Sequence, residues 1–479
     1  MTTSRPKVRV ASIINGKYLA FRKLGEGGCG VIYEVALVKC PQKRFAFKAE
    51  TTVPDEDPTL PMEHTVISLL NERNSLHAVK LVEKGKGENY SYIVMSLLGP
   101  SLDAIRSAIP THKFTTFSSL VMVIQALDSL KEIHEIGFVH RDVKPANFAI
   151  GALGTPKQRL VHILDFGIAR QYQKKDENGD WKLRMPRRIV PFRGTLRYCS
   201  IATQDRKEQG RHDDLWSLFY MIVEFIKGNL PWTGISDEEA VKAKKSDTKE
   251  LYDGLNEKFV LFAKHLQVLH YKNKPDYELL RELLVGVFLA HKFTTDMKVD
   301  WEKGGAYDAY FYKKTELLPC VTEKDTTEIS LAELLAIPEK VRRITLADAT
   351  KQEKNYDDDN ALNTAQDDTI IESEESVRIR NQRKKREEES RKQQATMSRK
   401  YKYKKKPDNR TVTTQQAKEA ELIWRRKQAA EYAARLAKRA EAQQRGNRDV
   451  VVPDEGSMRY RAKTPTVKRA ATPSKSSKK

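Results

Sequence analysis

The chain has 479 residues, a formal net charge of +21, 39% hydrophobic residues and 32% charged residues. No stretch reaches the run of about 18 apolar residues that a transmembrane helix needs, and the N-terminal sequence MTTSRPKVRV lacks the apolar core of a secretory signal. The four cysteines are far apart and form no CxxC pair, which argues against a disulfide framework or a zinc site. We therefore expect a cytoplasmic protein without a membrane partner.

The charge is unevenly distributed and divides the chain into three parts. Residues 1–312 carry 46 Lys and Arg against 38 Asp and Glu, residues 313–375 carry 8 against 16, and residues 376–479 carry 32 against 11. Low hydrophobicity combined with a large net charge is typical of segments that do not fold alone. We expect a folded domain over 18–305, an acidic linker over 313–375 and a basic, low-complexity tail over 376–479.

The folded part reads first as strands and then as helices. Between residues 18 and 98, the segments YLAFRKLG, GVIYEVALV, RFAFKAE and YSYIVMSL alternate or run apolar at strand length, and TLPMEHTVISLLNER has helical spacing. Residues 99–305 contain long segments of helical period, of which DDLWSLFYMIVEFIKG is apolar almost all round and predicts a buried helix. The sequence thus predicts an α+β fold with a small β-rich lobe and a larger helical lobe.

A glycine cluster lies between the first two predicted strands. Gly25, Gly27 and Gly30 form GxGxxG in KLGEGGCGVIYE. Glycine clusters also make ordinary hairpins, and a dinucleotide fold would require a helix after the loop. A strand on each side instead suits a hairpin whose backbone N–H groups fold over phosphates.

Lys48 and Glu63 follow this loop. Lys48 lies in the strand AFKAE, where a lysine is usually an outward-facing charge, but the short hairpin would bring it to the α- and β-phosphates of a nucleotide. It then needs a carboxylate partner. Glu63, on the helix that follows, would provide one, although it could equally be a solvated helix charge. Glu72 is the poorer candidate because it comes at the helix end.

Two further motifs complete a phosphotransfer site. VHRDVKPANFAIG has HRDxxxxN spacing, in which Asp142 would accept the proton of the substrate hydroxyl, Asn147 would bind one Mg²⁺ and Lys144 would neutralise charge on the γ-phosphoryl group. ILDFGIAR places Asp165 in a DFG triplet that would hold the other Mg²⁺. Each motif alone can arise by chance in an unrelated protein. All of them together, in this order, favour an active protein kinase using ATP and Mg²⁺.

Longer motifs add a resemblance to a known family. LLGPSL, RDVKPANFAIG, LDFGIARQY, FRGTLRYCS and GRHDDLWSLFYMIVEF resemble the casein kinase one superfamily, most closely its tau-tubulin kinase branch, over about residues 10–305. The resemblance implies a two-lobed protein-kinase fold (lobes 18–98 and 99–305) and Ser/Thr specificity. It implies that Met95 is the gatekeeper, that residues 96–98 contact adenine, and that Asp214 braces the HRD loop rather than being a simple helix-start charge. The expected cofactor-binding residues are Gly25, Glu26, Gly27, Gly30, Ile32, Ala46, Lys48, Glu63, Met95, Leu98 and Asp165.

Three positions depart from the family pattern. Cys29 replaces the usual aromatic residue at the tip of the glycine loop, and Ser96 stands where an acidic residue is common. Ala202 replaces the Asn of the SIN element. None of these changes removes a catalytic group.

The segment between DFG and GTLRY contains no Ser or Thr and is rich in Lys and Arg. We therefore expect activity without Ser or Thr phosphorylation there. In the superfamily, the counterpart of Arg197 belongs to an anion pocket, so with Arg193 it is our candidate substrate anion site. The resemblance and the charge both favour acidic or already phosphorylated protein substrates. The alternative is a solvated basic loop.

The tail permits several interpretations. Basic runs such as NQRKKR and RKYKYKKK fit docking on an acidic polymer such as tubulin, binding to nucleic acid, a solubilising tether, or nuclear import. We favour tubulin or microtubules over nucleic acid, and a monomeric, cytoplasmic or cytoskeletal protein. Residues 412–445 predict one helix. The acidic linker could restrain the basic loop. A scaffold protein that works through its tail, without catalysis, is the alternative function.

Overall fold

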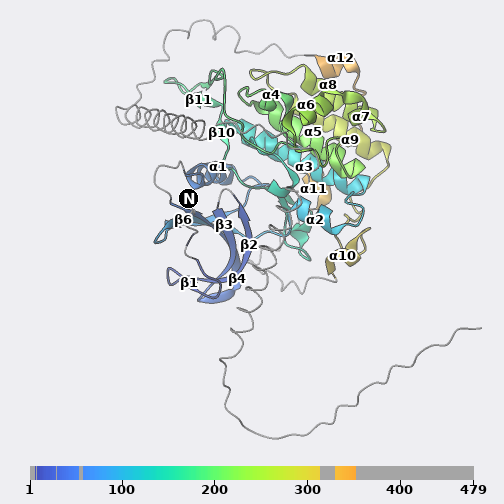
Figure 1. The fold of residues 1–479 in the computed structure, drawn as a ribbon. Coiled ribbons are helices and arrows are strands. Elements are labelled where there is room, and N and C mark those ends of the chain that lie inside the picture. The colour runs from blue at the N-terminus through green and yellow to red at the C-terminus, as the bar shows by residue number, and fades with distance from the viewer. Residues whose placement is uncertain (1–5, 7, 28–29, 53–57, 313–329, 352–479) are drawn as a thin grey trace, which may run out of the picture. The chain divides into compact units, whose positions relative to one another are not determined.

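The computed structural model describes residue 6 and residues 8–27, 30–52, 58–312 and 330–351. The first part of the chain forms a six-stranded antiparallel sheet in the order β1-β2-β3-β4-β6-β5, with helix α1 (Leu60–Glu72) beside it (Figure 1). The strands are β1 (Ile13–Ile14), β2 (Tyr18–Gly27), β3 (Gly30–Leu37), β4 (Cys40–Thr51), β5 (Leu81–Lys86) and β6 (Tyr90–Ser96).

The two faces of this sheet have different partners because side chains alternate along each strand. One face has its own apolar cluster, in which the rings of Phe47 and Tyr92 stack with centroids 4.6 Å apart. The other face, with Ala46 and Met95, joins the main core of the protein. Lys48 therefore points away from the Phe47 cluster, and β4 holds it in a buried position.

Helix α1 begins where Glu50 of β4 satisfies its first backbone donors. The Glu50 carboxylate accepts hydrogen bonds from the backbone N–H groups of Thr59 and Leu60, at 2.8 and 2.9 Å. A proline follows in the first turn, where its missing N–H costs nothing. The inward face of the helix buries Val66, Ile67 and Leu70. This attachment fixes the position of Glu63 in the first turn.

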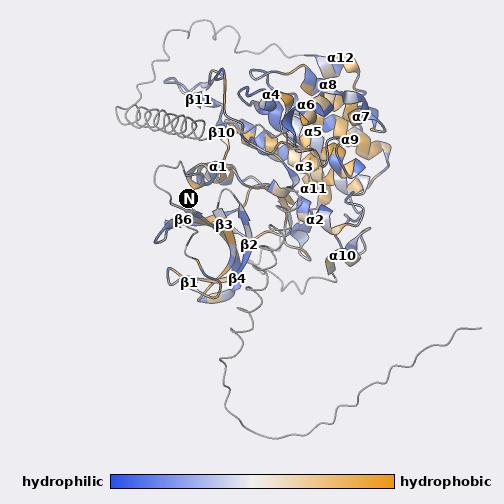
Figure 2. Cartoon of the chain, viewed as in Figure 1, coloured by the Kyte–Doolittle hydropathy of each residue, from blue (hydrophilic) through white to orange (hydrophobic). Residues whose placement is uncertain are grey.

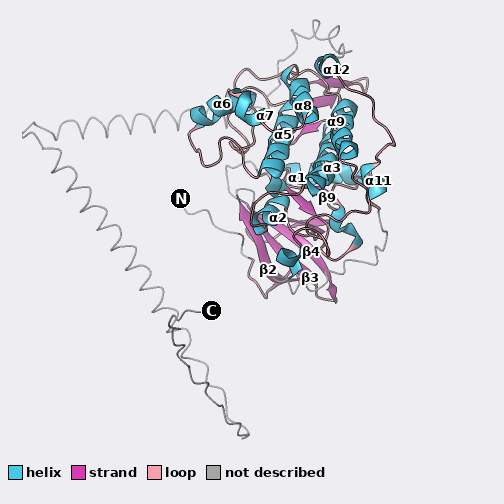
Figure 3. Cartoon of the chain, turned by 90° about the vertical axis from the view of Figure 1, so that its right-hand side faces the viewer, coloured by secondary structure: helices cyan, strands magenta, loops and turns pink. Residues whose placement is uncertain are grey.

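The rest of the domain is mainly helical, as Figure 3 shows from the side, and its helices carry most of the apolar residues in Figure 2. Helix α3 (Thr116–Glu135) and helix α5 (Arg211–Lys227) form the centre, and both are buried along most of their length. The α+β fold with two lobes is confirmed. The remaining helices of this lobe are α2 (Leu102–Ala108), α4 (Ile201–Gln204), α6 (Glu238–Ser246), α7 (Thr248–Tyr252), α8 (Glu257–Gln267), α9 (Tyr277–Ala290) and α10 (Asp308–Tyr312).

Short strands flank the predicted catalytic motifs between these helices. Each pairs with one other strand in an antiparallel ribbon, so the HRD and DFG segments are held against each other. The pairs are β7 (Phe138–Val139) with β10 (Arg170–Gln171), β8 (Phe148–Ile150) with β9 (Val161–Ile163), and β11 (Gln173–Lys175) with β12 (Trp181–Leu183).

The structure corrects the expectation of a linker over the whole of 313–375. Helices α11 (Leu331–Leu335) and α12 (Leu346–Thr350) pack on the helical lobe, and Leu335 is fully buried there. The ring of His265 in α8 lies 3.0 Å from the carbonyl oxygen of Ala349, and Arg281 in α9 donates to the carbonyl of Leu335. The prediction failed because five apolar side chains in a charged segment are enough to anchor two short helices.

The described residues all belong to one compact unit. The predicted helix at 412–445 and the basic tail lie outside the described residues, as does Cys29. Within the described ranges, no helix has the length and apolarity to cross a membrane.

Candidate active site

Lys48 lies between two carboxylates. Its Nζ is 2.5 Å from Oε2 of Glu63 and 2.9 Å from Oδ1 of Asp165. The Lys48 and Glu63 side chains are almost completely buried, whereas Asp165 is about one-third exposed. The strand, the helix and the DFG segment thus meet at one ammonium group, and Asp165 is the partner that keeps solvent access.

The three groups shift one another's proton affinities. Burial alone would lower the pKa of Lys48, but the negative charges of Glu63 and Asp165 outweigh it and raise that pKa. Burial raises the pKa of Glu63, and Lys48 only partly opposes it. Burial also opposes ionisation of Asp165, yet the nearby Lys48 lowers the pKa of this carboxyl. Lys48 is therefore a fixed positive charge with an ionised Asp165 beside it.

Asp142 is held by three side chains. Its Oδ1 accepts a hydrogen bond from Oγ1 of Thr195 at 2.7 Å, and its Oδ2 lies 2.6 Å from Nζ of Lys144. Asn147 donates from Nδ2 to the Asp142 carbonyl at 2.9 Å and to its carboxylate at 3.3 Å. Lys144 also donates to Thr195, at 3.2 Å. The HRDxxxxN segment and the threonine of GTLRY therefore converge on one carboxylate.

Asp214, near the start of α5, fixes the backbone of this loop. Its carboxylate accepts the backbone N–H groups of His140 and Arg141, at 2.7 and 2.8 Å, and it contacts the ring of His134 at 2.9 Å. The group is buried. Burial opposes its ionisation, but the His134 hydrogen bond lowers the pKa of Asp214. A buried anion with three donors is a rigid support for the residues next to Asp142.

Two non-glycine residues of the site adopt the left-handed backbone conformation. Arg141 has φ +70° and Asp165 has φ +64°. Such residues cost free energy unless their surroundings impose the conformation. Here Arg141 donates from Nε to the Ile168 carbonyl at 2.6 Å, and His140 contacts the Leu164 carbonyl at 3.0 Å. The HRD and DFG segments are thus joined directly.

The β2–β3 hairpin contains the glycines of the GxGxxG motif. Gly25 and Gly27 pair with Ile32 and Gly30 across the hairpin. Gly30 has φ +115°, and a Cβ there would come within 2.3 Å of the Ala49 carbonyl oxygen, so only glycine fits. Glu26 opposes Val31 in the same ladder.

Ala46 and Met95, two of the expected cofactor-binding residues, face each other in the register of β4 and β6. Leu98 is partly buried where the chain leaves the sheet, and it packs against the main core. Ala46 and Met95 therefore lie on the same face of the sheet as Lys48.

Asp165 and Asn147 form a donor set that fits Mg²⁺. Both hydrogen bonds of the Asn147 amide come from its nitrogen, which leaves the oxygen for a metal. Asp165 keeps part of its carboxylate exposed. Magnesium is usually bound by one or two protein oxygens together with phosphates and water. The part of the chain that the structure describes contains no cluster of three or more His, Cys, Asp or Glu side chains that could hold a metal ion.

A buried carboxylate orders the basic segment after DFG. Glu208 binds Arg187 with two hydrogen bonds, of 2.5 and 3.0 Å, and lies 3.1 Å from Arg170. Burial opposes ionisation of Glu208, but Arg187 and Arg170 lower its pKa. Arg141 of the HRD motif lies near these charges. Its burial, and to a smaller extent repulsion from Arg170, lowers the pKa of Arg141 to about 10. Glu208 thus gives the arginine cluster an internal anion.

The structure places the two candidate anion-site residues differently. Arg193 is exposed. Arg197 donates to the buried carboxylate of Glu224 and to Oγ1 of Thr233. Its charge is therefore compensated inside the helical lobe, and its role in anion binding stays a prediction.

Sequence reasoning missed Thr195 and Glu208 as site residues. Thr195 lies just after the segment between DFG and GTLRY, and its hydroxyl holds Asp142. The signal in the sequence was the glycine before it, Gly194. In the structure Gly194 has φ +110°, and a Cβ there would come within 2.5 Å of the Arg141 carbonyl oxygen. For Glu208, the signal was a basic segment without Ser or Thr, because arginines that no phosphate can neutralise need another anion.

Comparisons with known proteins agree with this geometry. Residues 18–288 match the protein kinase domain family. A putative serine/threonine-protein kinase of Caenorhabditis elegans is 36% identical over 299 residues, which cover 62% of this chain and 84% of that protein. A probable serine/threonine-protein kinase of Dictyostelium discoideum is 34% identical over 293 residues (61% and 57%), and the C. elegans serine/threonine-protein kinase spe-6 is 31% identical over 295 residues (60% and 76%). The chain therefore belongs to the protein kinase family and is a serine/threonine protein kinase.

Proposed function

We propose that this kinase phosphorylates Ser or Thr in acidic or cytoskeleton-associated proteins, and that it does so without phosphorylation of its activation segment. The observation that carries the proposal is the basic segment beside Asp142, where Glu208 already neutralises Arg170 and Arg187. In many kinases a phosphate on this segment provides the anion for such arginines. A built-in carboxylate removes that requirement and leaves other basic side chains free to attract acidic substrates.

Two hydroxyl groups near this segment could accept a phosphate, those of Tyr172 and Thr195. Their contacts support activity without phosphorylation. Tyr172 is buried and donates its hydroxyl hydrogen to the His134 carbonyl at 2.7 Å, so a kinase acting on it would have to unfold the segment. The Thr195 hydroxyl is engaged with Asp142. A phosphate on either residue would break a contact of the site.

The site residues suggest a role for each side chain in phosphoryl transfer. Asp142 would orient the substrate hydroxyl and accept its proton, while Lys144 would offset the charge that develops beside it. Lys48 would hold the phosphates of ATP, and Asp165 and Asn147 would hold Mg²⁺. ATP with Mg²⁺ supplies the phosphoryl group and the neutralising metal charge. The rigid support from Asp214 keeps these positions fixed, as positioning contributes much of the rate in phosphoryl transfer.

The resemblance to the tau-tubulin kinase branch favours tau- or tubulin-like substrates, with the basic tail as a docking element and a cytoplasmic or cytoskeletal location. The net positive charge of the tail suits an acidic polymer.

The test is transfer of labelled γ-phosphate to casein, tau and tubulin by the purified full chain, with Asp142→Asn as the blank. A version ending at residue 375 removes the basic tail but keeps all described residues, including α11 and α12. We expect transfer that needs Asp142 and a tubulin-specific loss on truncation. Enzyme treated with phosphatase should retain its activity. Equal transfer to casein and to a casein whose acidic residues have been neutralised would contradict the substrate class, and no transfer above the blank would favour the scaffold function.

A further inference from the structure

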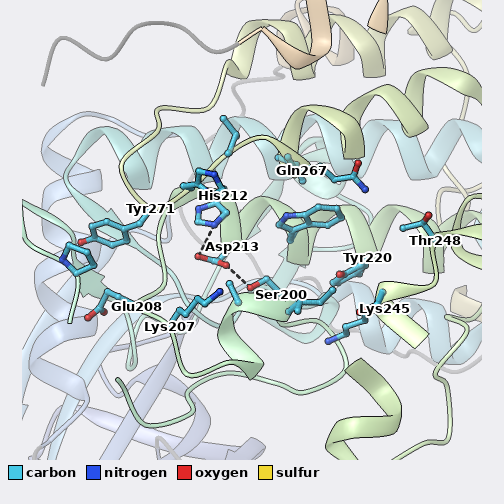
Figure 4. A pocket seen from close by; sticks show the side chains of 18 of the residues that line it. Ser200, Lys207, Glu208, His212, Asp213, Tyr220, Lys245, Thr248, Gln267 and Tyr271 are labelled. Carbon is cyan, nitrogen blue, oxygen red and sulfur yellow. Dashed lines mark hydrogen bonds and ion pairs between the residues drawn. The ribbon is translucent and has the colours of Figure 1, made fainter. Parts of the chain in front are cut away.

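A pocket of about 720 Å³ lies in the helical lobe (Figure 4). None of the side chains that contact Lys48 or Asp142 lines it, although Arg187 and Glu208 of the basic cluster do. It is lined by the basic segment around Arg187, by α4 and α5, and by the region from α6 to Tyr271. His212 and Asp213 lie near the middle of this lining, with Tyr271 on one side and Tyr220 on the other. Nothing in the phosphotransfer chemistry uses this pocket.

The pocket has an excess of positive charge that is not compensated internally. Its two carboxylates, Glu208 and Asp213, are both buried. Glu208 is bound by arginines, and Asp213 accepts from the Ser200 hydroxyl and the Gly210 N–H. At the edge, Arg188 is exposed, and the Lys207 side chain is 67% exposed with only a 3.6 Å contact to Asp205. The pocket edge thus presents cations to an incoming ligand.

The lining also includes apolar side chains and, among its described residues, one buried polar atom without a hydrogen-bond partner. Trp216, Leu269 and Tyr271 contribute apolar surface. His212 is 7% exposed, and its Nδ1 has no hydrogen-bond partner within the described ranges. Apolar walls with a few polar groups are typical of sites that bind one large side chain and fix its orientation. A peptide N–H or carbonyl could pair with the His212 ring.

The pocket lies close to the acceptor site along the chain. Thr195 contacts Asp142, and Ser200, only five residues later, lines the pocket. Five residues span at most about 18 Å. A substrate could therefore place its acceptor at Asp142 and a segment several residues away in the pocket.

We propose that this pocket docks an acidic segment of protein substrates, in which Asp or Glu flank one large apolar side chain. The apolar side chain enters beside Trp216 and Tyr271, and the acidic side chains pair with Arg188 and Lys207. The inference rests on the proposed acidic substrate class and extends it: acidity is recognised at a distance from the phosphorylated residue as well as beside it. Charge complementarity at the edge of such a site raises the association rate and selects the partner.

Direct binding tests the site without depending on activity. A fluorescent peptide, Asp-Glu-Leu-Glu-Asp, is titrated against the full-length protein by fluorescence anisotropy. We expect saturable binding that weakens about tenfold in Arg188→Glu/Lys207→Glu and about tenfold when the peptide leucine becomes glutamine. The matched control is Lys298→Glu/Lys303→Glu, which makes the same charge change at exposed lysines outside the pocket and should stay within twofold.

The kinase assay gives the second readout. The pocket double variant should raise the KM for casein severalfold and leave kcat and the KM for ATP unchanged, because its residues contact neither Asp142 nor Lys48. Loss of all transfer with intact peptide binding would reject the proposed function but not the pocket. Equal affinity of wild type and pocket variant would overturn the docking site. Binding that emerges only after deletion of residues 352–375 would also overturn it, since the chain's own acidic segment would then be the occupant.

Discussion

Thr195 donates its hydroxyl hydrogen to Asp142, with 2.7 Å between Oγ1 and Oδ1. Because Lys144 binds the other carboxylate oxygen, both oxygens of Asp142 are fixed before a substrate arrives. We expect Thr195→Ala to lower kcat about 10- to 100-fold through misplacement of the carboxylate. The KM for ATP should stay the same, because Thr195 contacts neither Lys48 nor Asp165.

Thr195→Ser is the matched control, since it keeps the hydroxyl, and it should restore most of the rate. Steady-state kinetics on casein would distinguish the two variants. Equal kcat values for Thr195→Ala and wild type would show that the hydrogen bond has no role in turnover.

Glu63 holds Lys48 in place. Glu63→Gln leaves Lys48 with Asp165 alone, and we expect kcat/KM for ATP to fall at least tenfold. Breaking a buried ion pair also costs about 3 kcal/mol of stability, which thermal unfolding would detect. Glu72→Gln, an exposed change on the same helix, should be neutral in both assays. A neutral Glu63→Gln would mean that Asp165 alone positions the lysine.

Glu208 replaces an activating phosphate in our proposal. Glu208→Gln removes the charge that orders Arg170 and Arg187, so we expect kcat to fall about tenfold and proteolysis of the 171–200 segment to become faster. Glu177→Gln changes the same charge at an exposed position of that segment and should have no effect. If Glu208→Gln kept full activity and protease resistance, the internal anion would be dispensable.

The packing of α11 makes its own prediction. Leu335 is fully buried against the helical lobe, and Leu335→Ala should cost about 2–5 kcal/mol of the free energy of unfolding. Leu346→Ala, at a residue 55% exposed, should cost less than about 0.5 kcal/mol. Denaturant unfolding of the two variants gives the comparison. Similar losses in both, or none in Leu335→Ala, would place α11 outside the folded domain.

His162 makes stability depend on pH. Burial lowers the pKa of His162 from the ordinary 6.5 to about 3, so the unfolded chain binds a proton that the folded chain does not. The folded state is therefore favoured above pH 6.5 and loses stability as the pH falls below it. Between pH 7 and 5.5 the loss from this group is about 1 kcal/mol.

His162→Gln should remove that part of the acid sensitivity, as measured by denaturant unfolding at the two pH values. His112→Gln, at an exposed histidine, should keep the wild-type difference. An unchanged pH dependence in His162→Gln would assign the acid sensitivity to other groups, of which the buried His134, whose pKa burial also lowers, is the next candidate.

The sequence by itself determined the two lobes and the motif spacing that makes Lys48, Asp142, Asn147 and Asp165 candidate site residues, because these depend on local period. It left Glu63 open between a partner of Lys48 and a solvated charge, and the fold brought the two side chains together. Strand alternation and helix period are set within a few residues, so they can be read without the fold. The GxGxxG, HRDxxxxN and DFG spacings are equally local, since each motif lies on one hairpin or loop.

Only the tertiary structure decided how distant groups pair. Three results depended on segments that lie far apart in the chain. Arg197 binds Glu224, Glu208 binds Arg170 and Arg187, and α11 packs on the helical lobe. The sequence does not distinguish a solvated arginine or leucine from a buried one. Its partner is chosen by packing, because an unpaired buried charge or an exposed apolar face costs too much free energy to persist.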